Sequence, residues 1–261
     1  MIDLYLVRSA LRDLTRTRNL IAAAVLVLAP GLLIWFLRLV ALNRGGQFDY
    51  AAVYSLMSEK VVFGFVMVIL SLVFCTSVVA QEVENKTIVY LLTRPIPRYR
   101  IITVKFVPAL LVTLVTVWTA LIIAAFSAYG LSHIGSSPLK HDLLLAPIGV
   151  LAYGTVFLLL TTLLHRPLIY GLLYAFGWET WVPNMPGSFQ RLSLMAYLRV
   201  LAPHSTPEAA EADITSVLTP QTQDVISSHI AWVVMITTIV VAFALALYTF
   251  SVREYVPRDA E

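Results

Sequence analysis

Residues 61–80 read V-V-F-G-F-V-M-V-I-L-S-L-V-F-C-T-S-V-V-A and contain no Asp, Glu, Lys, Arg or His. An α-helix needs roughly 20 apolar residues to cross the hydrocarbon core of a bilayer. Backbone groups in hydrocarbon must hydrogen bond within the protein, so a continuous apolar run favours a helix, whereas a barrel strand would alternate apolar and polar residues. The stretch therefore predicts a transmembrane helix.

The same kind of apolar segment recurs along the chain. The predicted spans cover residues 20–42, 61–80, 102–129, 143–164, 168–182 and 229–252. The chain is 59% hydrophobic and 13% charged, with a mean hydropathy of +0.83, which leaves too little polar surface for a water-soluble fold. We predict an all-α membrane protein, a six-span helical bundle that forms a single transmembrane domain over residues 1–261.

The fifth predicted span, residues 168–182, is shorter than the others. Its 15 residues extend about 22 Å as a helix, less than the roughly 30 Å of the hydrocarbon core. Proline and glycine follow it, and a semi-apolar stretch over residues 189–201 stops at Pro203. We predict a re-entrant or interfacial helix on the outer side of the membrane, within an external segment that covers residues 183–228.

Residues 1–19 carry two periodic stripes. One stripe is apolar (Leu4, Val7, Leu11 and Leu14) and the other is basic (Arg8, Arg12 and Arg16). Spacings of three and four indicate an amphipathic helix. Such a helix lies in the membrane interface, with its arginines near anionic headgroups. An ordinary charged leader is the alternative.

The basic residues flank the predicted spans instead of forming one soluble patch, which argues against nucleic acid as a partner. With a cytoplasmic amino terminus, the inner segments hold twelve of the 18 Lys and Arg residues: Arg8, Arg12, Arg16, Arg18, Lys86, Arg94, Arg98, Arg100, Lys105, Arg166, Arg253 and Arg258. This excess follows the positive-inside rule. We predict a multi-pass protein of the cell membrane with both termini in the cytoplasm.

The inner segment 81–100 reads Q-E-V-E-N-K-T-I-V-Y-L-L-T-R-P-I-P-R-Y-R. Glu82 and Glu84 favour the start of a short helix, because carboxylates stabilise the positive end of the helix dipole. Pro95 ends that helix, since a residue that precedes proline is biased away from helical geometry. The pattern predicts a compact helix that is joined to two spans and is able to push on both.

This segment resembles the first cytoplasmic loop of the permease subunits of type-2 ABC transporters. The matching residues are Glu82, Glu84, Thr87, Leu91, Leu92, Thr93, Arg94, Pro95, Ile96, Arg98 and Lys105. Family members often have glycine where this chain has Lys86. The six spans, the amphipathic amino-terminal helix and the outer re-entrant segment extend the resemblance over nearly the whole chain.

The resemblance implies that the segment is a coupling helix seated in a cleft of a separate ATPase. The residues that it assigns to coupling are Glu82, Glu84, Thr87, Ile88, Leu91, Leu92, Arg94, Pro95 and Arg98. It also implies two ATPase subunits, a second permease copy in a homodimer, and export of an amphipathic substrate. A solvated turn whose charges only fix the topology is the alternative for this segment.

The chain contains no G-x-x-x-x-G-K-[ST] motif, so it does not bind ATP through a phosphate loop of that kind. The apolar runs of the second, third, fourth and sixth spans lack ionisable residues that would relay protons. We therefore predict a permease, not an enzyme, that is driven by ATP and magnesium bound to a partner. The five histidines lack the spacing of a metal site. A passive resistance, immunity or scaffold protein is the rival function.

Glu179 is the only acid in the short fifth span, and Trp178 and Trp181 flank it. We predict Glu179 and Trp178 as a candidate outer gate. A capped interfacial carboxylate within an aromatic belt is the alternative.

Overall fold

The computed structural model describes residue 14 and residues 17–43, 49–84, 98–133, 137–164, 166–185, 187–202 and 227–252. All of the regular elements in these ranges are helical, which confirms the predicted all-α class for the described part of the chain. The interfacial helix, most of the coupling segment and most of the external segment lie outside these ranges.

Five helical stretches are long and apolar enough to cross a membrane. The elements that form them are α2 (Thr17–Asn43), α3 (Tyr50–Leu56), η1 (Met57–Val66), α4 (Met67–Glu84), α6 (Arg98–His133), α7 (Leu139–Leu163) and α12 (Ser228–Val252). The candidate spans within them are Ile21–Asn43, Tyr50–Val78, Tyr99–Gly130, Leu139–Leu163 and Ser228–Val252. A multi-pass membrane protein follows from these helices.

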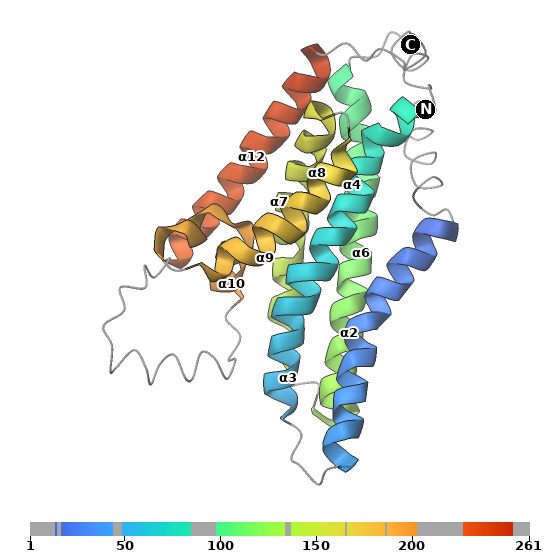
Figure 1. The fold of residues 1–261 in the computed structure, drawn as a ribbon, viewed down its shortest axis with the longest axis vertical. Coiled ribbons are helices and arrows are strands. Elements are labelled where there is room, and N and C mark those ends of the chain that lie inside the picture. Colours follow the sequence, from blue (N-terminus) through green and yellow to red (C-terminus); the bar gives the residue numbers. More distant parts are fainter. Residues whose placement is uncertain are drawn as a thin grey trace.

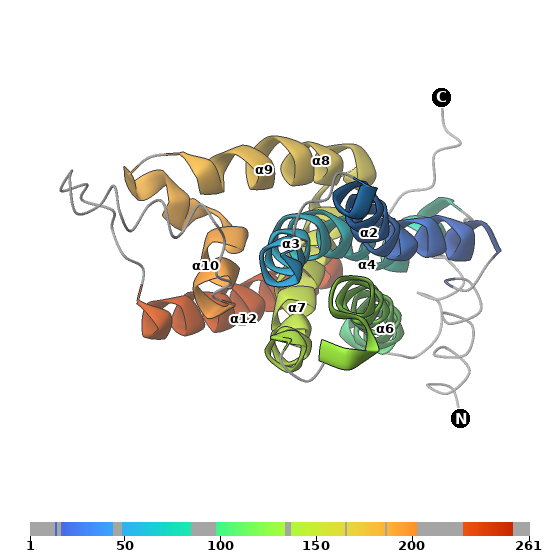
Figure 2. The same ribbon diagram turned by 90° about the horizontal axis from the view of Figure 1, so that it is seen from below.

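The continuous path through α3, η1 and α4 forms the centre of the bundle (Figures 1 and 2). The protein buries 67% of the most apolar part of the Tyr50–Val78 span, compared with 22% for the spans in α2 and α12. The two peripheral helices therefore present most of their apolar side chains outward. In a membrane protein such faces contact lipid or another subunit.

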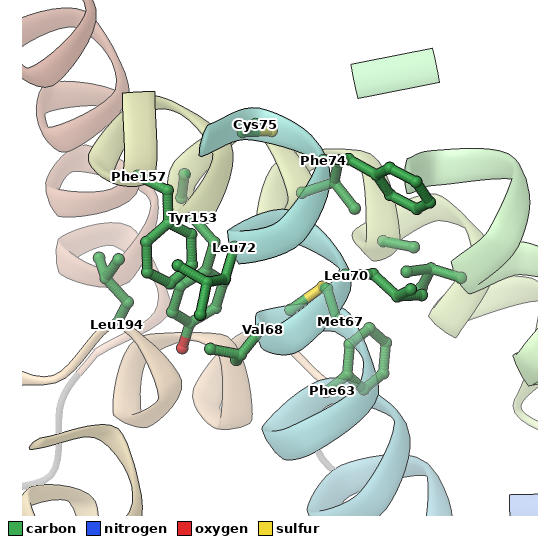
Figure 3. Packing of buried hydrophobic residues seen from close by; sticks show 14 of the residues in the cluster. Phe63, Met67, Val68, Leu70, Leu72, Phe74, Cys75, Tyr153, Phe157 and Leu194 are labelled. Carbon is green, nitrogen blue, oxygen red and sulfur yellow. The ribbon is translucent and has the colours of Figure 1, made fainter. Parts of the chain in front are cut away.

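Small residues set the distance between helices. A Cβ atom on Gly31 of α2 would lie 2.4 Å from Ile123 Cγ2 of α6. Only glycine allows this approach, as expected where helices associate through close packing. Between α4 and α7 the core is formed by large side chains, including Tyr153, which stacks on Phe157 at a ring-centroid distance of 6.4 Å (Figure 3).

The predicted fifth span is broken into short pieces. They are α8 (Pro167–Leu173), the π-helical η3 (Tyr174–Trp178), α9 (Glu179–Trp181), and the 3-10 turns η4 (Val182–Asn184) and η5 (Gly187–Leu192), followed by α10 (Leu194–Leu201). α10 folds back beside α12 after the α8–α9 stretch (Figures 1 and 2). We call residues 167–201 the outer hairpin, after the predicted outer re-entrant segment that they include. The hairpin is not among the five span-length helices, so the sixth crossing stays a prediction.

Several helices extend beyond the apolar runs. The second span starts at Tyr50 instead of residue 61, because Asp49 caps α3 by accepting hydrogen bonds from the Ala51 and Ala52 amides at 3.0 and 3.1 Å. The expectation that Glu82 and Glu84 begin a separate helix is wrong, because both belong to the last turn of α4. The apolar run predicts only the part of a helix that lies in lipid. The helix itself can extend further, until a capping residue such as Asp49 or a break in the backbone hydrogen bonds ends it.

Candidate functional site

The coupling segment is framed by the end of α4 and the start of α6. Glu82 and Glu84 lie in the last turn of α4, and Arg98 is the first residue of α6. Thr87, Ile88, Leu91, Leu92, Arg94 and Pro95 lie outside the described residues, as do Arg8, Arg12 and Arg16 of the predicted interfacial helix. The end of α4 and the start of α6 occupy the same end of the bundle as the end of α12 (Figure 1).

Lys105 is the one coupling-pattern residue whose side chain the structure describes, and it is 7% exposed within α6. A long basic side chain near a span end commonly packs its methylene groups on apolar neighbours. The basic residue therefore belongs to the packed part of α6.

The opposite half of the bundle, which the predicted topology places on the outer side, contains a buried carboxylate at Asp142, near the start of α7. Its side chain is fully buried. Tyr54 Oη and Ser58 Oγ each donate a hydrogen bond to Asp142 Oδ2, at 2.6 and 2.9 Å. Removing a carboxylate from water is strongly unfavourable unless donors replace the lost hydration. The contact therefore fixes α7 to α3 and η1.

An aromatic group and a histidine extend this outer contact. The Tyr129 ring of α6 meets Tyr54 edge to face at 5.5 Å and lies 5.1 Å from the Tyr50 ring. His141 Nε2 lies 2.9 Å from the Leu201 carbonyl oxygen, which joins the start of α7 to the end of α10. Polar or aromatic contacts thus connect α3, η1, α6, α7 and α10 in this half of the bundle.

Glu179, the candidate gate residue, is only 5% exposed. Its carboxylate accepts hydrogen bonds from Tyr174 Oη at 2.8 Å, from the Ser193 hydroxyl, and from the amides of Leu194 and Met195 at 3.0 and 3.3 Å. These amides begin α10, where the helix dipole also favours a negative charge. Glu179 is therefore a buried cap that holds the two arms of the outer hairpin together.

Trp178, the other candidate gate residue, is 42% exposed. Its Nε1 donates to the Leu192 carbonyl at 3.1 Å, so it also joins the two arms of the hairpin. The adjacent Trp181 is exposed as well. Tryptophans with an apolar body and one polar contact are typical of the membrane boundary.

An ion pair joins the outer hairpin to the central helix. Arg199 Nε of α10 lies 2.9 Å from Glu59 Oε1 of η1, and the two side chains are 24% and 13% exposed. Lys60 Nζ lies 3.7 Å from the same oxygen and is more exposed, at 37%. The Tyr153 hydroxyl, buried in α7, makes no hydrogen bond to the described residues.

The sequence prediction missed most of this outer site. It found the apolar runs of the second, third, fourth and sixth spans free of ionisable residues, yet Glu59 and Asp142 lie inside the candidate spans Tyr50–Val78 and Leu139–Leu163. Asp142 directly precedes the apolar run at residue 143, and Glu59 is separated from the run at residue 61 only by Lys60, so extending each run by one helical turn would have included them. Among the described residues, no group of three His, Cys, Asp or Glu side chains is arranged to hold a metal ion.

Comparison with known proteins identifies a family to which this chain is similar. The model of a family described as ABC-2 family transporter protein matches residues 15–178 of the 261. A search of curated proteins gives no match. The matched region contains α2, α3, η1, α4, α6 and α7, together with the coupling segment between α4 and α6.

Proposed function

The chain belongs to the ABC-2 transporter family and is a membrane permease of an ABC transporter, and we propose that it exports an amphipathic substrate with energy from a separate ATPase. The family match over residues 15–178 carries this proposal, because it includes both the spans and the segment between α4 and α6. The chain itself has no phosphate-binding loop.

In this proposal, the coupling segment at residues 81–100 transmits the movement of the ATPase to the permease. The segment joins α4, which packs in the centre of the bundle, to α6, which runs over 36 residues. A helix transmits displacement along its axis because its backbone hydrogen bonds keep it stiff. A push on the segment would therefore move the central helix and its neighbour together.

The complete transporter in this proposal contains two permease copies and two ATPase subunits, in the cell membrane. The apolar outer faces of α2 and α12 offer surface for lipid or for the second copy. Both termini lie in the cytoplasm, which agrees with the excess of basic residues in the predicted inner segments. The parallel direction of α7 and α12 (Figure 1) supports a return of the chain across the membrane between them.

The test is co-expression with the ABC ATPases of the same organism, followed by purification in lipid nanodiscs and measurement of ATP hydrolysis. The variants are Leu91→Ala and Arg94→Ala in the coupling segment. We expect each to weaken co-purification or to lower ATP hydrolysis. Lys140→Ala, at an exposed site near the opposite end of the bundle, is the matched control and should leave both unchanged.

Full assembly and full turnover in both coupling variants would overturn the assignment of the coupling segment. Failure of the unmodified chain to bind any ABC ATPase would favour the rival function, a passive resistance or scaffold protein. A transport assay in vesicles with amphipathic dyes as probes then tests the substrate class.

A further inference from the structure

The π-helical segment η1 contacts the outer hairpin through two side chains and approaches it closely at Gly64. Glu59 pairs with Arg199 of α10 at 2.9 Å. The Phe65 ring meets the Phe176 ring of η3 edge to face at 5.6 Å. The position of a Cβ on Gly64 is 3.7 Å from Met195 Cε of α10. The hairpin therefore contacts the central helix where that helix is π-helical.

A π-helix of ten residues is unusual, since most π-helical segments are single turns that mark functional sites. Glycine helps this geometry at position 64, because a Cβ there would lie 3.3 Å from the Glu59 carbonyl oxygen. Conversion of the π-helical turns to α-helical turns would rotate the side chains that follow η1. The segment is thus suited to change shape.

The two sides of η1 are held differently. On one side, Ser58 donates to the fully buried Asp142 of α7. On the other side, the Glu59–Arg199 pair is partly exposed to solvent and joins two elements only through side-chain ends. A fully buried contact is costly to break, whereas water can replace a partly exposed pair. The ion pair is therefore the more easily broken of these two polar contacts.

We propose that Glu59 and Arg199 form a lock that holds the outer hairpin against η1 and keeps the outer end of the permease closed. The proposal rests on the transport function above, and it makes Glu59 and Arg199 gating residues. Glu179 is a positioning residue: it keeps the hairpin intact, so that α10 moves as one piece. When the lock opens, η1 and α10 separate and water reaches the face of α10 that is buried in the closed form.

The test measures the exposure of α10 with a single cysteine at Ala196, which is 7% exposed. Cys75, the only native cysteine, is replaced by alanine, and the full chain is studied in membranes with a maleimide reagent. We expect Arg199→Gln and Glu59→Gln each to raise the labelling rate about five- to thirtyfold, the ratio that one or two kcal/mol produces. This arm needs no ATPase, so it is independent of the proposed energy source.

Lys60→Gln is the matched control, because Lys60 is adjacent and basic but more exposed and 3.7 Å from the carboxylate. It should leave labelling unchanged. The double variant Glu59→Arg with Arg199→Glu restores the pair with reversed charges and should return labelling to the starting rate, which separates a lock from general unfolding. Equal rates in Arg199→Gln and Lys60→Gln, or no rescue by the reversed pair, would overturn the lock.

A second arm adds the ATPase. In the assembled complex, ATP should raise the labelling of Ala196→Cys in the chain with the intact pair. If Arg199→Gln raises the labelling rate and ATP does not, the lock is supported and the proposed coupling is rejected. If ATP raises the labelling rate and Arg199→Gln does not, the coupling is supported and the lock is rejected.

Discussion

The Asp142 carboxylate joins three elements of the bundle. The carboxylate of α7 accepts hydrogen bonds from Tyr54 of α3 and Ser58 of η1, and its side chain has no contact with solvent. Hydrogen bonds to an ionised acceptor are stronger than those to a neutral one. Ionisable groups inside a membrane protein are costly and are commonly linked to function.

We predict that Asp142→Asn destabilises the protein, because the two hydroxyls lose a charged acceptor while the amide is placed in a fully buried site. The expected loss is about 1–3 kcal/mol, or a fall of about 3–10 °C in the apparent melting temperature in detergent. Asp49→Asn is the matched control. Asp49 is exposed and caps α3, and asparagine caps a helix about as well, so its melting temperature should stay unchanged. Equal melting temperatures for both variants would contradict a stabilising charge at Asp142.

At the level of elements, the docking of α8 on α4 depends on one glycine. A Cβ on Gly171 would lie 2.2 Å from Leu72 Cδ1, and Leu72 is only 1% exposed, so it has little room to move. We predict that Gly171→Ala lowers stability by about 1–3 kcal/mol, the usual effect of overpacking a filled site. Thermal unfolding in detergent measures this.

Gly177→Ala is the paired control for that prediction. A Cβ on Gly177 approaches only Leu173 Cδ1, at 3.9 Å, which is ordinary van der Waals contact. Alanine also loses less backbone entropy than glycine in a helix. The control should therefore be neutral or slightly stabilising. A loss of stability in Gly177→Ala that equals the loss in Gly171→Ala would show that helix propensity, not packing, governs this region.

The sequence was sufficient to predict the five span-length apolar helices, because long apolar runs have few other solutions in a bilayer. It also predicted that residues 168–182 are too short for a comfortable crossing, and the structure divides them among α8, η3, α9 and the start of η4. The π-helical geometry of η1 was not predictable. Its residues have the same apolar composition as an α-helix, and the wide turn depends on contacts with distant partners.

Of the residues that make contacts in the outer site, the sequence singled out only Glu179 and Trp178. Glu179 is conspicuous as an acid between two tryptophans, but its partners Tyr174, Ser193 and the start of α10 are identified only by the fold. Glu59 and Arg199 are 140 residues apart in the chain. No local pattern indicates such a pair, because long-range contacts have no periodic signature.

For the whole molecule, the polar contacts form one connected series at the outer end. Asp142 joins α7 to η1, Glu59 joins η1 to α10, and Glu179 joins α10 to α9. The opposite end carries the α4–α6 connection that the family resemblance assigns to coupling. In the proposed mechanism the central path through α3, η1 and α4 links the two ends, because η1 makes the polar contacts with α7 and α10 and α4 leads into the coupling segment.

The number of crossings is the last prediction at this scale. Asn43 and Ser227 are exposed at helix ends that a six-crossing path places outside, and Tyr99 and Arg166 are exposed at ends that it places inside. Single cysteines at these four positions, in the Cys75→Ala chain, should divide accordingly: an impermeant maleimide added to intact cells labels Asn43→Cys and Ser227→Cys, and labels the other two only after permeabilisation. If Ser227→Cys, like Arg166→Cys, is labelled only after permeabilisation, the outer hairpin enters and leaves on one side. That outcome leaves five crossings and places the two termini on opposite sides of the membrane.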